Sequence, residues 1–188
     1  MRSRILATAE QLFRHYGYTK TTVADIAREL GMSPANVYRF FPSKLAINEA
    51  LCAQILAERE ATILAISRSE GSARDRLKEI LLANNRMTRA TLMDEKKVHE
   101  MVVVAMEENW GAIQEYKDRQ SRIIAKVIGE GIAAGEMVAS DPLAAAECVQ
   151  RAYVAMFHPL LAAHCAEEDE DGSGAEVMAD FILRALRP

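Results

Sequence analysis

The amino-acid sequence predicts an all-α protein of about nine helices. Its composition is biased towards Ala, Leu, Ile, Met and Glu, whose side chains lose little rotamer freedom in a helix, whereas aromatic residues make up only 6% of the 188 residues. Apolar residues recur at helical spacing, and no alternating strand of convincing length is present. Proline is scarce and falls at segment edges. Half of the residues are apolar and 27% are charged, as in an ordinary globular protein.

Two glycines mark the ends of the first two predicted helices. Residues 3–16 place apolar side chains on one helical face, and Gly17 follows as a C-cap, because glycine accepts a left-handed backbone at little steric cost. Thr22 opens the second helix, and Asp25 three residues later makes a short-armed capping box. Gly31 stops the second helix.

A short third helix and a long fourth helix follow. Ser33 can cap the third helix, and Pro34 suits its first turn, because the missing N–H needs no partner there. This helix is predicted over residues 34–40, since Pro42 disfavours a helical backbone at the residue before it. Ser43 can cap the fourth helix.

The body of the chain is predicted to consist of further helices. An aspartate followed by Pro142 is a typical helix start, and Gly135 ends the helix before it. An acidic loop that contains glycine, residues 167–174, precedes the last helix. The predicted helices of the body run from Ser43 to about residue 67, over 73–92, from Asp94 onward, and over 111–134, 142–165 and 175–187.

Charge is distributed unevenly along the chain. Residues 1–44 hold seven basic and three acidic residues, whereas residues 45–188 hold 16 basic and 24 acidic ones. The two parts therefore carry net charges of +4 and −8, within a total of −4. A basic N-terminal part on an acidic body favours contact with a polyanion, although chance surface charge can give the same difference.

The sequence argues against several other classes of protein. No apolar run approaches the ~20 residues needed to cross a bilayer, and Glu10, Gln11 and Arg14 interrupt the N-terminal apolar residues, unlike a signal peptide. The three cysteines lie far apart without a CxxC or Cys/His cluster, which predicts reduced thiols, a cytoplasmic location and no metal site. No phosphate loop, GxSxG elbow or HExxH motif is present, so we expect neither enzyme activity nor a cofactor.

Residues 22–44, TVADIARELGMSPANVYRFFPSK, have the pattern of a helix-turn-helix. In this motif the second helix enters the major groove of DNA, while the first crosses the DNA backbone. Ala27 is small where the two helices must cross, and Gly31 supplies the turn. The predicted core of the motif consists of Leu12, Phe13, Ile26, Leu30, Val37 and Phe41.

The outer face of the third helix is predicted to contact DNA. Asn36 can bind adenine and Arg39 can bind guanine through pairs of hydrogen bonds, which discriminates between bases by ~1–3 kcal/mol; either can instead hold a phosphate. Phosphate contacts are predicted for Thr21, Thr22, Tyr38 and Lys44. The full set of predicted DNA-binding residues is Thr21, Thr22, Pro34, Ala35, Asn36, Tyr38, Arg39 and Lys44.

The run ILATAEQLFRHYGYTKTTVADIARELGMSPANVYRFFPSK closely resembles the N-terminal DNA-binding domain of the TetR family of bacterial transcriptional regulators. The resemblance is specific over residues 4–51. Beyond them only length, helicity and helix order match. It implies a DNA-binding domain over residues 1–46 and a helical ligand-binding and dimerisation domain over residues 47–188.

One position departs from this resemblance. The family usually has a histidine just before the Phe-x-Ser-Lys run, where this chain has Phe40. Because that histidine often helps with a contact to the DNA backbone, two alternatives remain here. Either the phosphate is left to Tyr38 and Lys44, or Phe40 packs under the domain.

The resemblance also implies a dimeric repressor that a small-molecule inducer releases from double-stranded operator DNA. The homodimer is expected through residues 142–165 and 175–187, although these could instead be core helices of one protomer. The effector is expected to be largely apolar, because adaptable methionines and aromatic rings are the available lining; the same residues could equally be core. The candidate pocket residues are Met87, Met101, Met106, Trp110, Tyr116, Tyr153, Phe157 and His158.

A helical scaffold or partner-binding protein without ligand control is the alternative function. Residues 1–44, taken without the motif, would fit a plain three-helix subdomain. A scaffold, however, does not need hydroxyl groups, Tyr38 and Lys44 around a glycine turn.

Overall fold

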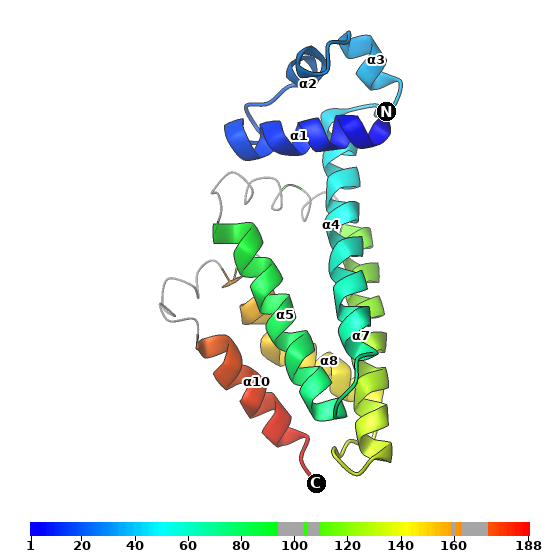
Figure 1. Cartoon of the computed structure of the whole chain (residues 1–188), viewed down its shortest axis with the longest axis vertical. Helices are drawn as coiled ribbons and strands as arrows, with labels where there is room; N and C mark the ends of the chain where they lie inside the picture. The colour runs from blue at the N-terminus through cyan, green and yellow to red at the C-terminus, as the bar shows by residue number, and fades with distance from the viewer. Residues whose placement is uncertain (94–103, 105–109, 159–160, 163–172) are drawn as a thin grey trace. The chain divides into compact units, whose positions relative to one another are not determined.

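The described part of the chain is helical throughout. A computed structural model describes residues 1–93, 104, 110–158, 161–162 and 173–188, and within these ranges it contains eight helices and no strand (Figure 1). The predicted fold class is therefore confirmed. The helices are α1 (Arg2–Tyr16), α2 (Val23–Glu29), α3 (Pro34–Tyr38), α4 (Lys44–Ser67), α5 (Ala73–Met93), α7 (Trp110–Ala133), α8 (Pro142–Phe157) and α10 (Gly174–Ala185).

The chain forms two compact units. Unit 1 comprises Met1–Ala57 together with Thr91–Ile113, and unit 2 comprises Glu58–Ala90 together with Gln114–Pro188. Helix α4 supplies its first part to unit 1 and its last part to unit 2. Unit 1 thus extends further along α4 than the predicted boundary after residue 46, and it includes a second segment of the chain.

Local caps determine where the short helices of unit 1 begin. The Thr22 side chain accepts a hydrogen bond from the Asp25 N–H, and the Asp25 carboxylate accepts one from the Thr22 N–H at 2.9 Å, so the predicted capping box is present. The Ser33 side chain accepts from the Asn36 N–H, and Pro34 occupies the first turn of α3. These bonds satisfy N–H groups that have no partner within the helix.

Unit 1 has its own hydrophobic core. Most of the core predicted for the helix-turn-helix is fully buried, while Leu12 and Leu30 are only partly buried. Burial of Val37 attaches α3 to the other helices of the unit, since α3 is too short to be stable alone. The buried residues are Ile5, Ala9, Phe13, Tyr18, Val23, Ile26, Ala27, Val37, Phe41, Ile47 and Leu51.

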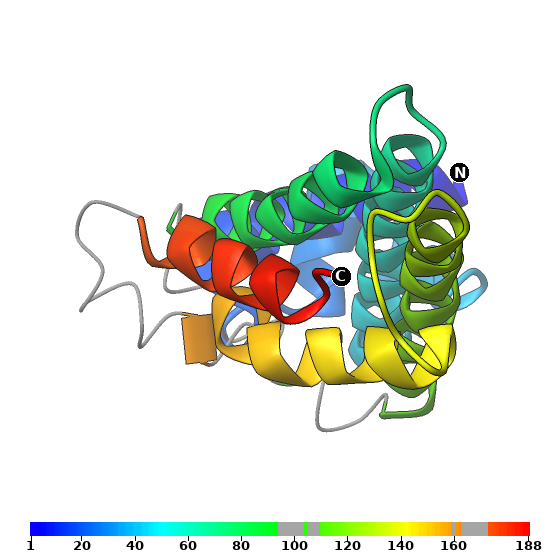
Figure 2. The ribbon, with the colours of Figure 1, turned by 90° about the horizontal axis from the view of Figure 1, so that it is seen from below.

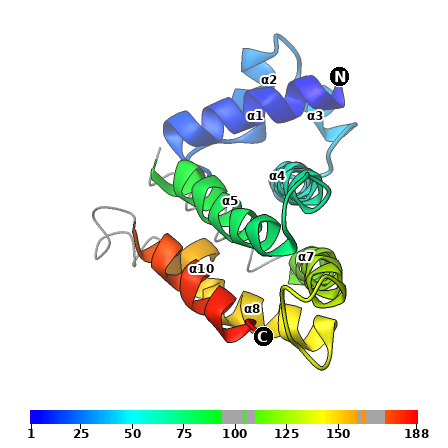
Figure 3. The same cartoon turned by 60° about the horizontal axis from the view of Figure 1, so that its bottom comes forward.

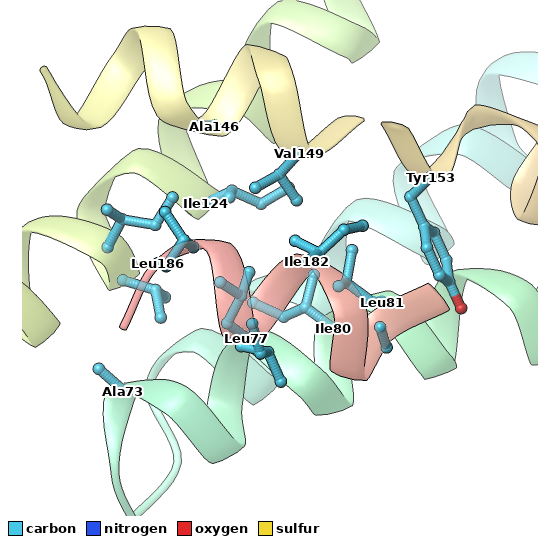
Figure 4. Close-up of a cluster of buried hydrophobic side chains, with 14 of the residues drawn as sticks. Ala73, Leu77, Ile80, Leu81, Ile124, Ala146, Val149, Tyr153, Ile182 and Leu186 are labelled. Atoms are coloured by element: carbon cyan, nitrogen blue, oxygen red, sulfur yellow. The ribbon is translucent and has the colours of Figure 1, made fainter. Parts of the chain in front are cut away.

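Unit 2 has a second core, to which α5, α7, α8 and α10 all contribute. Figure 4 shows Ile182 of α10 and Leu186, the C-cap of this helix, among the buried side chains of α5 and α8. Figures 2 and 3 show α10 alongside α5. Between these two helices, the Lys78 ammonium pairs with the carboxylates of Glu176 at 3.1 Å and Asp180 at 2.8 Å. Helix α10 is therefore held to α5 by apolar packing and by surface ion pairs.

The helix predicted over residues 142–165 ends earlier in the structure. Helix α8 stops at Phe157, and His158 is extended, with φ −73° and ψ 124°. Pro159 explains the stop, because a proline ring disfavours a helical backbone at the preceding residue and has no N–H to donate. Helical backbone is present again at residues 161–162. The prediction of one continuous helix was therefore wrong.

The other predicted helices of the body agree with the structure where it describes them. Helices α4, α5, α7 and α10 begin and end within two residues of their predicted ranges. The helix predicted from Asp94 lies outside the described residues, as does most of the acidic loop 167–174. None of the described helices is both long enough and apolar enough to cross a membrane.

The capping box of α2 predicts a pH-dependent stability. Hydrogen bonds from Thr22, and further attraction by Arg28, hold the pKa of the Asp25 carboxyl below its ordinary value of 3.8. Because this folded-state pKa is depressed, the stabilisation is present at neutral pH and is lost as the pH falls through that pKa. We expect Asp25→Ala to lower the midpoint of thermal unfolding near neutral pH, with a difference from wild type that vanishes in acid.

The midpoints can be measured by far-ultraviolet circular dichroism of the full chain over a pH series. Glu29→Ala is the matched control, since it removes a carboxylate from the last turn of the same helix. A deficit of Asp25→Ala that stays constant well below pH 3.8 would contradict the role of the ionised carboxylate.

Candidate nucleic-acid interface and effector region

Helix α3 and its C-cap turn one residue inward and present the others outward. Val37 is 0% exposed and belongs to the core of unit 1, whereas Tyr38 is 50% exposed. The outward side chains include an amide, a phenol and a guanidinium, which can donate hydrogen bonds to base edges and phosphates. The exposed residues are Pro34, Ala35, Asn36, Tyr38 and Arg39, each of which is a predicted DNA contact.

Thr21 and Thr22 use their hydroxyl groups within the protein. Thr21 is 2% exposed, and its hydroxyl donates to the Gly17 carbonyl at 2.8 Å, with the Leu12 carbonyl at 3.3 Å. The exposed Thr22 donates its hydroxyl proton to the Asp25 carboxylate at 2.6 Å. Thr21 therefore ties the loop before α2 to the end of α1, and Thr22 caps α2. Both hydroxyl donors have partners within the protein, and the phosphate contacts of these two residues stay predictions.

Lys44 closes the loop between α1 and α2. Its Nζ donates to the carbonyls of Tyr18 at 2.9 Å and Thr21 at 3.1 Å, and it lies 4.2 Å from the centroid of the Tyr18 ring. Partial burial lowers the pKa of the ammonium. An ammonium group has three N–H donors, so one remains for a phosphate after these two bonds. Lys44 thus combines a structural role, which was not predicted, with the capacity for the predicted contact.

Arg2 and Phe40 form a further contact that was not predicted. The Arg2 guanidinium donates to the Phe40 carbonyl at 2.7 Å and lies 4.1 Å from the centroid of the buried Phe41 ring. The Phe40 side chain is itself 37% exposed. It is therefore not packed under the domain, which was one of the two alternatives for this position.

The described aromatic candidates for an effector pocket are buried or partly buried in unit 2, and of these Tyr153 belongs to its core while Phe157 packs against that core. Tyr153 is 0% exposed, its ring stacks on Phe157 with the centroids 6.4 Å apart, and its hydroxyl donates to the Ala175 carbonyl at 3.3 Å. Tyr116 is 8% exposed, and burial raises the pKa of its phenol to about 12. Met87 packs against the same core. These side chains therefore have structural contacts of their own.

His158 follows α8 and has an unused ring nitrogen. Its Nδ1 is buried and has no hydrogen-bond partner among the described residues. Burial, and secondarily the charge of Lys117, lowers the pKa of the imidazole. Two other candidates, Met101 and Met106, lie outside the described residues, and the side chain of Trp110 is not described.

A pair of buried amides in unit 2 is absent from the predictions. Asn84 and Gln120 are 4% and 3% exposed; the Gln120 amide donates to the Asn84 side-chain oxygen at 3.4 Å and to the Tyr116 hydroxyl. Buried amides need such partners. A sequence signal was available, because Asn84 continues the helical spacing of the inward-facing Leu77 and Leu81.

Polar side chains of α5 also bind the end of α8. The Asn85 amide donates to the Met156 carbonyl at 2.7 Å, and the Thr88 hydroxyl donates to the Phe157 carbonyl at 3.0 Å. The Arg59 guanidinium donates to the Thr88 hydroxyl at 3.0 Å. The last carbonyls of a helix have no partner within it. These polar groups therefore connect α4, α5 and α8 within unit 2 by hydrogen bonds.

An open groove lies where α7 connects to α8. Its volume is about 570 Å³, and none of the candidate pocket residues lines it. The lining residues are Ile132, Gly135, Met137, Val138, Ala139, Ser140 and Pro188. Across the described ranges, no group of three or more His, Cys, Asp or Glu side chains could hold a metal ion.

Two solved structures share the fold along the whole chain. A transcriptional regulator from Cytophaga hutchinsonii ATCC 33406 has a TM-score of 0.74 and 24% sequence identity, covering 98% of this chain and 97% of that one. A transcriptional regulator of the TetR/AcrR family from Thermobifida fusca YX-ER1 also has a TM-score of 0.74 and 24% identity, covering 100% and 98% of the two chains. At this identity the likeness shows the fold.

A similarity in sequence is confined to a part of the chain. The nucleoid occlusion factor SlmA of Haemophilus influenzae (strain PittGG) is 38% identical over 65 residues, which are 35% of this chain and 30% of SlmA. The match therefore spans less than a third of the length of that relative, and it does not carry the activity of SlmA to this chain.

Two family models, one for each end of the chain, together match most of its residues. Residues 5–51 match the bacterial regulatory proteins of the tetR family, and residues 73–178, more than half of the chain, match the tetracyclin repressor-like C-terminal domain. Regulators of this family bind operator DNA, form homodimers and are not enzymes. The chain belongs to the TetR family and is a DNA-binding regulator of transcription.

Proposed function

We propose that this regulator is a dimeric repressor that reads its operator through the outer face of α3 and is released by a small-molecule inducer. The observation that supports the reading surface is the burial of Val37, which leaves the neighbouring side chains of α3 exposed. A bound dimer represses by covering DNA that the polymerase needs. Its two reading helices fit half-sites ~34–36 Å apart, or a multiple of that spacing.

Each exposed side chain of α3 has a role in this proposal. Asn36 and Arg39 contact base edges, because an amide and a guanidinium can each make the paired hydrogen bonds that distinguish bases. Tyr38 and the remaining donor of Lys44 contact phosphates. Thr21 takes no direct part, since its hydroxyl is buried and bonded to the Gly17 carbonyl.

The dimer interface is proposed on α8 and α10, together with the exposed Leu161. Val177 and Phe181 on α10 are 62% and 61% exposed, although α10 also contributes buried residues to the core of unit 2. On α8, exposed small residues such as Ala144 and Ala152 allow a second helix to approach closely. When two copies are related by a two-fold axis, the apolar stripe of one copy can face the small-residue stripe of the other. Such a surface suits self-association.

The inducer is proposed to bind in unit 2. The buried Nδ1 of His158 supports this location, since a buried polar nitrogen normally has a partner and this one has none among the described residues. The buried amides of Asn84 and Gln120 add hydrogen-bonding groups to the interior of the same unit. We therefore propose an effector that combines apolar surface with at least one hydrogen-bonding group, rather than a purely apolar one. The absence of ligand control is the competing possibility, and it predicts that no small molecule weakens DNA binding.

Arg39→Ala tests the reading surface. We expect it to lower affinity by about 10- to 100-fold for a duplex that the wild-type chain has selected from a random-sequence library, because a paired contact to a base is lost. Affinity for an unselected duplex should change little. Fluorescence anisotropy at several salt concentrations measures both. Arg14→Ala is the control, since it removes the same charge from the last turn of α1. Equal binding by Arg39→Ala and wild type would refute the assignment.

Lys44→Met tests the dual role of Lys44. Loss of the donors to Tyr18 and Thr21 should lower the free energy of unfolding by about 1–2 kcal/mol, measured by urea denaturation. Affinity for selected and unselected duplexes should fall by similar factors, because phosphates are common to both. Unchanged stability together with weaker DNA binding would show that Lys44 serves only as a phosphate contact.

Phe181→Asp tests the dimer interface. A charge in the centre of an apolar interface should shift the chain from dimer to monomer in sedimentation analysis, and should weaken operator binding with it. Val138→Asp is the matched control, because Val138 is a 48% exposed apolar residue outside α8 and α10. Dissociation by Val138→Asp but not by Phe181→Asp would place the interface elsewhere.

A further inference from the structure

One side chain holds both residues that follow the C-cap of α3. The Arg2 guanidinium donates to the Phe40 carbonyl at 2.7 Å and lies over the Phe41 ring, 4.1 Å from its centroid. Arg2 is the first residue of α1, so the contact joins the start of the chain to the segment that connects α3 to α4. Hydrogen bonds with an ionised donor are stronger than neutral ones, and a guanidinium binds well to an aromatic face.

Helix α3 depends on contacts from outside itself. It has only five residues, and a helix this short does not repay the cost of its own nucleation. Its last backbone bonds, from the Phe40 and Phe41 N–H groups to the Val37 carbonyl, are 2.9 and 3.1 Å long and lead directly into the segment that Arg2 holds. The side chains of Val37 and Phe41 fix the inner side of this turn by burial. The Arg2 contact fixes its outer side.

Arg2 is not required for the core of unit 1. Its side chain is exposed, whereas the core consists of apolar residues that remain when Arg2 is replaced. Exposed contacts of this kind contribute little to the stability of a free protein. When DNA covers this surface, water is excluded, and the same hydrogen bond becomes stronger because the local dielectric falls. The contact is therefore already present before DNA binds and becomes stronger in the bound state.

We propose that Arg2 is a positioning residue for DNA recognition: it holds the turn after α3 so that Tyr38 and Arg39 keep the direction needed to contact DNA. The inference rests on the proposed reading of DNA by α3. Arg2 acts through the Phe40 carbonyl and the Phe41 ring, and not as a phosphate ligand. A phosphate ligand and a positioning residue differ in their effect on the salt dependence of binding, because only the former releases a counterion on binding.

The test uses the full chain and two probes, a duplex selected by the wild-type chain from a random-sequence library and an unselected duplex of equal length. We expect Arg2→Ala to lower affinity for the selected duplex by about 10-fold, as for the loss of one charge-assisted bond. The slope of log affinity against log salt should equal the wild-type slope, and affinity for the unselected duplex should change by less than about 2-fold. Arg4→Ala removes the same charge two residues away. It should leave the affinity for the selected duplex and for the unselected duplex close to the wild-type values.

Arg2→Lys keeps the charge but lacks the planar guanidinium, and it gives a result even when Arg2→Ala folds poorly. Positioning predicts an affinity between those of wild type and Arg2→Ala at the wild-type salt slope. Full recovery in Arg2→Lys, or a slope reduced by about one together with equal losses on both duplexes, would make Arg2 a phosphate ligand and overturn the proposal. Wild-type affinity in Arg2→Ala would overturn it as well. Failure of the wild-type chain to select any duplex would overturn the proposed function itself, and the inference with it.

Discussion

Burial of Val37 is the constraint on which the proposed DNA-reading surface depends. A five-residue helix has no stability of its own, so α3 exists because one of its side chains enters the core of unit 1. Once that side chain points inward, helical geometry turns the neighbouring side chains outward. The cap at Ser33 and the turn after Tyr38 then limit the helix to the length that can lie in a groove. The reading surface is therefore a consequence of core packing.

Two basic residues near this surface bind the protein's own carbonyl groups. Lys44 holds the loop before α2, and Arg2 holds the turn after α3. Each places its cation over an aromatic ring as well as on a carbonyl. Part of the positive charge of residues 1–44 thus orders the proposed reading surface before DNA binds. Order that exists before binding lowers the entropy lost on binding, so these cations can contribute to affinity without touching a phosphate.

The sequence predicted those features that depend on residues close to one another along the chain. The capping box between Thr22 and Asp25 spans three residues, and the outward face of α3 follows from helical periodicity. The stop before Pro159 depends on adjacent residues too, and here a single proline outweighs a long apolar pattern. The contact between Arg2 and Phe40 joins residues 38 positions apart, and no spacing rule encodes such a pair. The candidate effector residues rest on side-chain type alone, which does not separate a ligand contact from a core residue.

In the proposed operator complex, the outer face of α3 lies against base edges. Photo-cross-linking tests it most directly, with p-benzoylphenylalanine in place of Asn36 and, in a control chain, in place of the exposed Lys126 of unit 2. We predict cross-links from position 36 to bases of the selected duplex, competed by that duplex and not by an unselected one, and none from position 126. Absence of a cross-link at position 36 in a chain that still binds the duplex tightly would contradict it.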